Sequence, residues 1–93
     1  GSIAIDSDLM AKVNIKNYEK VHVLNLTNGS RLETYTIPDI PGSKSICING
    51  AAAHLVNPGD RVIIVSYCSL DLEESDDHKP SIIRLNEQND IVG

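Results

Sequence analysis

The sequence predicts a mainly β protein, folded as a small closed barrel of six or seven short strands with short helices. The chain of 93 residues has no Phe or Trp, so aliphatic residues must build its core. The β-branched members of this group favour strands. Short apolar runs recur along the chain between Gly, Pro and Asn turn signals, with little room for long helices. This spacing is typical of a small barrel.

The first predicted strand covers residues 2–6, where polar and apolar residues partly alternate. Asp6 or Ser7 can accept a hydrogen bond at the start of a short helix, which we expect over residues 8–13. Residues 14–20 are mostly polar and predict a loop before the next strand.

A β-hairpin is predicted next, with strands over residues 20–25 and 31–37. Asn28 and Gly29 lie between these strands. Both residue types accept the positive φ that a type I′ turn requires, so the pair predicts a tight hairpin connection.

The middle of the chain predicts two more strands. Residues 45–48 form the first, and a short helical turn over residues 51–56 follows it. A turn at residues 57–60 precedes the longest apolar stretch, residues 61–70. Such a continuous apolar run indicates a strand that is buried on both faces.

An acidic stretch opens the last part of the chain. Residues 71–77 hold five of the 13 acids and predict a solvated surface loop, which Pro80 ends. Short closing strands are expected at residues 81–85 and 90–92. The net charge of −5 comes from this stretch, since the other acids match the eight basic residues in number. This balance argues against a nucleic-acid partner, which requires a basic patch.

Residues 1–93 are expected to form one domain. No apolar run reaches the ~18 residues that a membrane span needs, so no membrane partner is expected. Cys47 and Cys68 lie in apolar runs and predict buried free thiols rather than a metal site, with a disulfide as the alternative. Two cysteines without a visible export signal suggest a reducing, cytoplasmic location.

Three side chains of the predicted strand 31–37 share one face by period-two alternation: Arg31, Glu33 and Tyr35. An arginine can bind a substrate carboxylate through two parallel hydrogen bonds, or it can simply pair with Glu33 at the surface. Tyr35 can be a proton donor or a packing residue, and Tyr67 is the better candidate for the core. Thr34 points to the opposite face unless a bulge turns it.

Asn49, Gly50, Ala51 and Ala52 form a second candidate segment. Small residues let the backbone approach a ligand, and backbone N–H groups at the entry to a helical turn can hold an anion. The alternative is an ordinary strand-to-helix turn.

Three segments together resemble the pyruvoyl-dependent aspartate decarboxylase family: Gly1-Ser2, residues 31–35 and residues 48–54. The resemblance runs through nearly the whole chain. It implies a double-ψ barrel, a homotetramer, and decarboxylation of L-aspartate to β-alanine for pantothenate biosynthesis. The family cuts its own chain at a Gly-Ser bond, which here corresponds to Gly1-Ser2.

The resemblance also implies a covalent pyruvoyl group derived from Ser2 and no metal. The Ser2 hydroxyl would attack the Gly1 carbonyl, and elimination and hydrolysis would leave a ketone that forms a Schiff base with the substrate amine. Arg31 matches the family's carboxylate-binding arginine and Tyr35 its proton donor. Thr34 matches a residue of processing and substrate contact, so either a bulge turns it or the two faces of the strand serve neighbouring subunits. Asn49, Gly50, Ala51 and Ala52 match the rest of the substrate site.

The family carries a short N-terminal segment before the processing site, which becomes a separate chain after cleavage. Nothing precedes Gly1 here, so we expect the single barrel domain to lack this segment. The rival interpretation is a non-catalytic barrel that binds or assembles with a partner. In that case Gly1-Ser2 carries no chemistry, and Arg31 and Tyr35 are structural.

Overall fold

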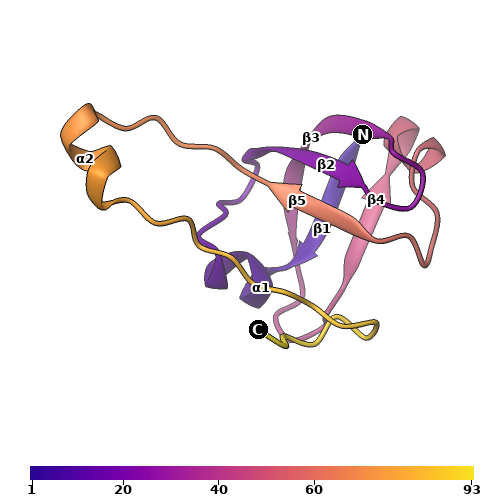
Figure 1. Cartoon of the computed structure of the whole chain (residues 1–93). Coiled ribbons are helices and arrows are strands. Elements are labelled where there is room, and N and C mark those ends of the chain that lie inside the picture. Colours follow the sequence, from indigo (N-terminus) through magenta and orange to yellow (C-terminus); the bar gives the residue numbers. More distant parts are fainter.

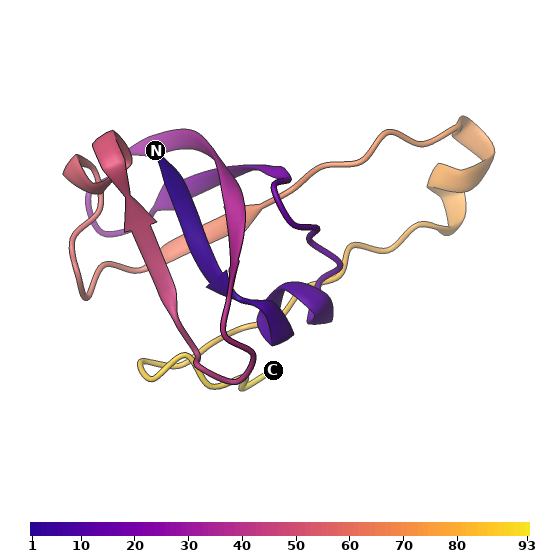
Figure 2. The ribbon, with the colours of Figure 1, turned by 180° about the vertical axis from the view of Figure 1, so that it is seen from behind.

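The computed structural model describes all residues from Gly1 to Gly93, and five strands form its mixed sheet in the order β4-β1-β3-β2-β5. The strands curl into a half-barrel (Figures 1 and 2). The mainly β class with short helices is therefore confirmed, and closure of the barrel stays a prediction. The strands are β1 (Ser2–Asp6), β2 (Lys20–Asn25), β3 (Arg31–Asp39), β4 (Ile46–Asn49) and β5 (Val62–Val65).

The N-terminal strand β1 lies inside the sheet. It pairs in parallel with β3 and antiparallel with β4. Helix α1 (Ser7–Lys12) follows β1 directly, and the Asp6 carboxylate caps it by accepting the N–H of Asp8 over 2.8 Å. The predicted cap and short helix are therefore confirmed, with the helix starting one residue earlier.

The core lies between α1 and the inner face of the sheet. Alternate residues of β1 and β2 point into it, as the period-two geometry of a strand requires. Seven buried apolar side chains form the cluster: Ile3, Ile5, Leu9, Met10, Val21, Val23 and Leu32. Ser2 lies on the opposite face of β1 from Ile3 and Ile5. This core therefore does not account for its burial.

The hairpin of β2 and β3 is confirmed, but its predicted type I′ turn is wrong. Gly29 has a φ of +79°, whereas Asn28 is not among the residues with positive φ. The connection is longer than a two-residue turn because the Asn25 side chain folds it. Its Oδ1 accepts the N–H of Thr27 over 2.9 Å, and the Gly29 N–H bonds to the Asn25 carbonyl over 2.8 Å.

The apolar run after residue 60 gives the edge strand β5, not a strand buried on both faces. It pairs only with β2, and 45% of Ile63 is exposed. Tyr67 and Cys68 follow where the chain leaves the sheet. Tyr67 is 65% exposed and Cys68 is exposed, so their predicted burial is wrong.

The other thiol, Cys47, is also free and exposed rather than buried. It lies on β4, the opposite edge of the sheet, where alternate residues face outward.

The acidic stretch forms helix α2 (Leu72–Asp77), not the predicted loop. It is solvent-exposed as expected and stands away from the sheet on two extended segments (Figures 1 and 2). Glu73 and Glu74 occupy its first turn, where acidic side chains stabilise a helix.

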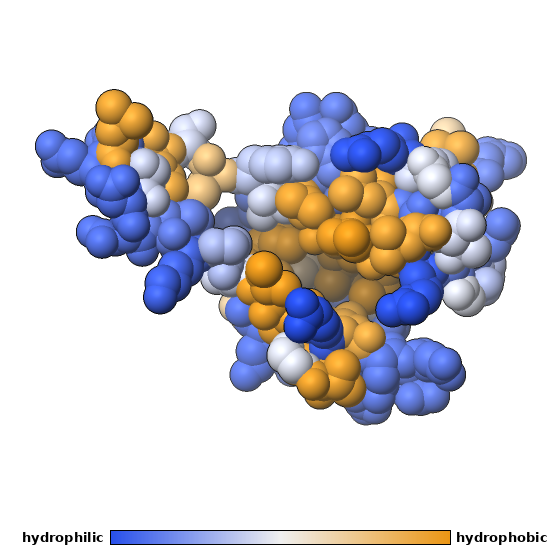
Figure 3. Space-filling view, viewed as in Figure 1, coloured by the Kyte–Doolittle hydropathy of each residue, from blue (hydrophilic) through white to orange (hydrophobic).

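The predicted closing strands at 81–85 and 90–92 are reduced to one bridge between Leu85 and Ile91. Ile83 and Leu85 still pack against the core, so the C-terminal segment covers part of it. Figure 3 shows apolar side chains gathered around a hollow on one face, with hydrophilic side chains at the rim and on much of the α2 arm. No helix has the length and apolar character needed to cross a membrane.

Candidate functional site

The start of β1 places Ser2 between two neighbouring strands. Ser2 pairs with Asn49 of β4, and its side chain is buried, with 6% of the residue exposed. The Asn49 Nδ2 donates a hydrogen bond to the Ser2 Oγ over 3.1 Å. This contact orients the hydroxyl oxygen beside the Gly1–Ser2 peptide bond. The hydroxyl proton stays free, because the oxygen accepts in this bond.

Gly1 lies tightly against the beginning of the 3-10 helix η1 (Gly50–His54). A Cβ on Gly1 would come within 2.6 Å of the Asn49 carbonyl oxygen and 3.0 Å of the Ala52 Cβ. Gly50 has a φ of +69°, and a Cβ there would lie 3.0 Å from the Gly1 Cα. Only glycine fits at both positions without displacing its neighbours.

The predicted helical turn over residues 51–56 is therefore confirmed as η1, with an earlier start. Ala52 is half-buried against Gly1, whereas Ala51 is exposed. The structure thus brings together five of the predicted site residues at one place: Gly1, Ser2, Asn49, Gly50 and Ala52.

Strand β3 carries the other predicted residues. Arg31, Glu33 and Tyr35 lie on its exposed face, as the alternation predicts, and Thr34 lies on the buried face. The pairing of β2 with β3 runs without a bulge from Lys20–Tyr35 to Leu24–Arg31. Thr34 therefore keeps the orientation that strand alternation gives it. Its Oγ1 is buried and has no hydrogen-bond partner.

The parallel register of β1 with β3 shows which β3 residues lie level with the candidate cleavage bond, Gly1–Ser2. Ile3 pairs with Thr36 in the parallel ladder. Continuing that register by two residues brings Ser2 level with Tyr35 and Gly1 level with Thr34. Arg31 lies four residues earlier in β3, roughly 13 Å along the strand. The structure therefore does not bring Arg31 next to Ser2 within one chain.

The structure contains an ion-pair cluster beside Tyr35 that the sequence pattern did not predict: Lys20, His22 and Glu33. Glu33 accepts from His22 Nε2 over 3.0 Å and pairs with Lys20 Nζ over 3.1 Å, both from β2. The hydrogen bonds from His22 and then Lys20, with their charges, lower the pKa of the Glu33 carboxyl. The cross-strand register of the predicted hairpin could have predicted this cluster, because it places His22 opposite Glu33.

Arg31 takes part in none of the salt bridges of the chain, so the alternative pairing of Arg31 with Glu33 is not observed. Its guanidinium is exposed, and its cross-strand neighbour is Leu24. Arg31 is thus open to an external carboxylate.

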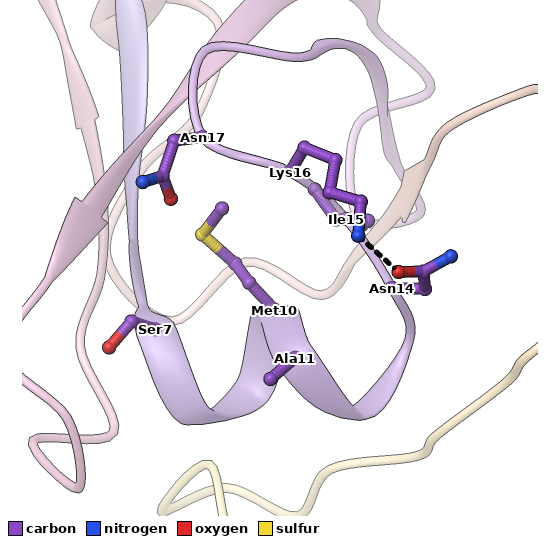
Figure 4. Close-up of a pocket in the computed structure, with 7 residues that line it drawn as sticks. All are labelled: Ser7, Met10, Ala11, Asn14, Ile15, Lys16 and Asn17. Carbon is purple, nitrogen blue, oxygen red and sulfur yellow. Dashed lines mark hydrogen bonds between the residues drawn. The ribbon is translucent and has the colours of Figure 1, made fainter.

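Two shallow hollows lie elsewhere on the chain. One is formed by α1 and the loop after it, with Met10, Asn14 and Lys16 among its lining residues (Figure 4). The other lies beside Lys20, His22 and Tyr67. Neither includes Ser2. No group of three or more His, Cys, Asp or Glu side chains is arranged to hold a metal ion.

Comparison with known proteins shows which family the chain is related to. The sequence model of the aspartate decarboxylase family matches residues 1–92. A relative from Clostridium kluyveri named aspartate 1-decarboxylase is 54% identical over 91 residues, which are 98% of this chain and 72% of that protein. Proteins of the same name from Bacillus licheniformis and Caldicellulosiruptor bescii are 53% and 51% identical, and each match covers 72% of the relative. The chain therefore belongs to the aspartate decarboxylase family.

Proposed function

We propose that this chain is the larger part of an aspartate 1-decarboxylase, which converts L-aspartate to β-alanine and carbon dioxide after self-cleavage between Gly1 and Ser2. Relatives that bear this name match at least 98% of the chain at about half identity or more. The observation that carries the proposal is the geometry of Gly1 and Ser2. Ser2 is buried with its Oγ held by Asn49, and Gly1 is packed where no side chain fits.

Self-cleavage begins with attack of the Ser2 Oγ on the carbonyl carbon of Gly1. The peptide C–N bond breaks as the ester C–O bond forms, and the hydroxyl proton passes to the released amine. Loss of the Ser2 α-proton then breaks the Cβ–O bond and releases Gly1 as a carboxylate. Water replaces the nitrogen of the resulting dehydroalanine, and ammonia leaves. Asn49 orients the oxygen that starts this sequence.

The site fits a pyruvoyl group at position 2. Cleavage separates Gly1 and carries away the Ser2 oxygen, so the smaller pyruvoyl group fits within the space that Gly1 and Ser2 fill beside Ala52 and Asn49. When present, such a ketone supplies an electron sink for carbon dioxide loss. The buried Thr34 Oγ1 has no partner in the chain, and it lies in the residue level with Gly1. It is available to contact the backbone around the cleavage point.

The other residues bind substrate and move a proton. Arg31 binds a substrate carboxylate through its planar guanidinium, which the chain leaves unpaired. Tyr35, level with Ser2 in the register, donates a proton to the carbon that loses carbon dioxide. Asn49, Gly50, Ala51 and Ala52 form the wall of the site with their small side chains and backbone N–H groups.

The assembly belongs to the same proposal: one barrel domain in the cytoplasm, a short N-terminal chain released by cleavage, and a homotetramer. The edge strands β4 and β5 each pair on one side only. Exposed strand edges favour pairing with another segment or chain. A homotetramer also allows Arg31 of one subunit to approach Ser2 of another, which a single chain does not achieve.

The deciding experiment is a mass spectrum of the natural full-length product with a β-alanine assay on the same sample. We expect two fragments, with the larger one beginning at position 2 and blocked to Edman degradation, and β-alanine production from L-aspartate. A single intact chain without activity would refute the proposal and favour a non-catalytic barrel module.

A further inference from the structure

The exposed face of the β2–β3 hairpin carries one acid in an unusual position. Glu33 lies between Arg31 and Tyr35 on the same face of β3. Residues two apart on a strand are separated by about 6.6 Å, a distance that arginine and glutamate side chains readily span. Glu33 is therefore the acid best placed along β3 to neutralise Arg31.

The structure directs Glu33 to the other strand instead. Its Oε1 bonds His22 Nε2 over 3.0 Å, and its Oε2 pairs with Lys20 Nζ over 3.1 Å. Both carboxylate oxygens thus have a partner on β2. The ring of His22 also contacts Tyr67 edge to face, with 5.2 Å between centroids, which limits how the imidazole can turn.

Arg31 receives no corresponding partner. Its neighbour across the hairpin is Leu24, whose side chain offers no acceptor, and it forms no ion pair. The pairing of β2 with β3 thus holds the Glu33 carboxylate on β2 and leaves the Arg31 guanidinium, two residues away on β3, unpaired.

We propose that Lys20 and His22 are positioning residues that hold Glu33 on β2 and so keep Arg31 free for the substrate carboxylate. This inference rests on the proposed function of Arg31. A released Glu33 would act on Arg31 at an effective concentration on the order of millimolar, as a tethered group does. It would compete with a dicarboxylate substrate and leave the chemical step unchanged.

The test uses the full-length, self-cleaved enzyme and the double variant Lys20→Met with His22→Phe, which removes both partners of Glu33. We expect the KM for aspartate and the inhibition constant of succinate to rise together by about three- to tenfold, the range for two exposed ion pairs. The kcat should stay within about twofold. Adding Glu33→Gln to this variant should restore both constants, because no competing carboxylate remains.

A matched control is His78→Phe with Lys79→Met, which changes the same residue types on the arm that carries α2 and should leave both constants unaltered. If the double variant is not cleaved, Lys20→Met and His22→Phe are measured singly against the same third substitution. Unchanged constants in a cleaved variant, or no restoration by Glu33→Gln, would overturn the inference while the proposed function stands. A wild-type protein that neither cleaves nor decarboxylates would refute the proposed function and this inference with it.

Discussion

The Asn49 side-chain amide donates to the Ser2 hydroxyl oxygen over 3.1 Å and joins two residues that lie 47 positions apart in the sequence. The two residues face each other in the antiparallel pairing of β1 with β4. The oxygen that starts the proposed cleavage is therefore positioned by a strand from the middle of the chain.

Ser2→Ala in the full-length protein should abolish both cleavage and activity, because no oxygen remains to attack the Gly1 carbonyl. Mass spectrometry and a β-alanine assay measure the two effects. Ser81→Ala is the control, since Ser81 is exposed and makes no side-chain hydrogen bond. Decarboxylation by the Ser2→Ala protein would exclude Ser2 as the source of the reactive group.

Gly50→Ala should slow self-cleavage. Alanine at a φ of +69° costs about 1–2 kcal/mol, and its Cβ would lie 3.0 Å from the Gly1 Cα. The strain falls on the backbone that holds the cleavage point, so intact chain should accumulate in a time course. Gly42→Ala is the matched control, because Gly42 has a φ of +80° with open space around it. Equal cleavage rates in both variants would contradict a close-approach role for Gly50.

Arg31→Lys should leave cleavage intact but reduce kcat/KM for aspartate by about ten- to a hundredfold, because lysine keeps the charge and loses the two-point contact. Steady-state kinetics on the cleaved protein measure this loss. Arg84→Lys, at another exposed arginine, is the control. Wild-type kinetics for Arg31→Lys would make Arg31 an ordinary surface residue.

Tyr35→Phe should fold and cleave but decarboxylate about 10²–10⁴-fold more slowly, the usual contribution of a general acid. The ring and its packing remain, and only the phenolic proton is lost. The kcat of the cleaved variant is the measurement, with Tyr18→Phe at another exposed tyrosine as control. A normal kcat would assign Tyr35 to binding or assembly.

Asp6→Asn should destabilise the fold at neutral pH and flatten its acid sensitivity. Burial raises the pKa of the Asp6 carboxyl, but backbone hydrogen bonds from Lys44, Asp8 and Gly42 outweigh it and lower the pKa overall. A lowered pKa gives stability that is present above the unfolded value of about 3.9 and lost as pH falls through the folded value.

Urea unfolding at pH 7 and pH 3 measures this effect. The midpoint of the wild type should fall more between the two pH values than that of Asp6→Asn. Asp77→Asn on the exposed helix α2 should behave like the wild type. Parallel pH dependence in wild type and Asp6→Asn would show that Asp6 is not the sensitive group.

Local signals predicted the parts of the fold that depend on neighbouring residues. The cap at Asp6 and the β2–β3 hairpin follow from residue types a few positions apart. The parallel pairing of β1 with β3 does not, because no residue of either strand encodes which partner lies beside it. The apolar run of β5 was misjudged for the same reason: Val62 and Ile64 pack against the core, but nothing covers Ile63 on the other face, and the run does not encode what packs against each face.

In the candidate site, too, local strand alternation was predictable from the sequence, whereas contacts between separate segments were not. Alternation placed Arg31, Glu33 and Tyr35 on one face, and it gave Thr34 its orientation. The contact of Glu33 with Lys20 and His22 required the cross-strand register, which the strand pattern alone did not supply. The close approach of Gly1 to Gly50 is a tertiary contact between distant segments, so the sequence gives no measure of it.

Because β1 lies inside the sheet, between β4 and β3, the proposed self-cleavage reports on folding. Ser2 meets Asn49 only after β4 has joined β1, and it comes level with Tyr35 only after β3 has joined on the other side. Both pairings close long loops, so they form late compared with a hairpin. Under the proposed cleavage, a nascent or misfolded chain keeps its Gly1–Ser2 bond, and a cut chain marks a molecule that has completed its sheet.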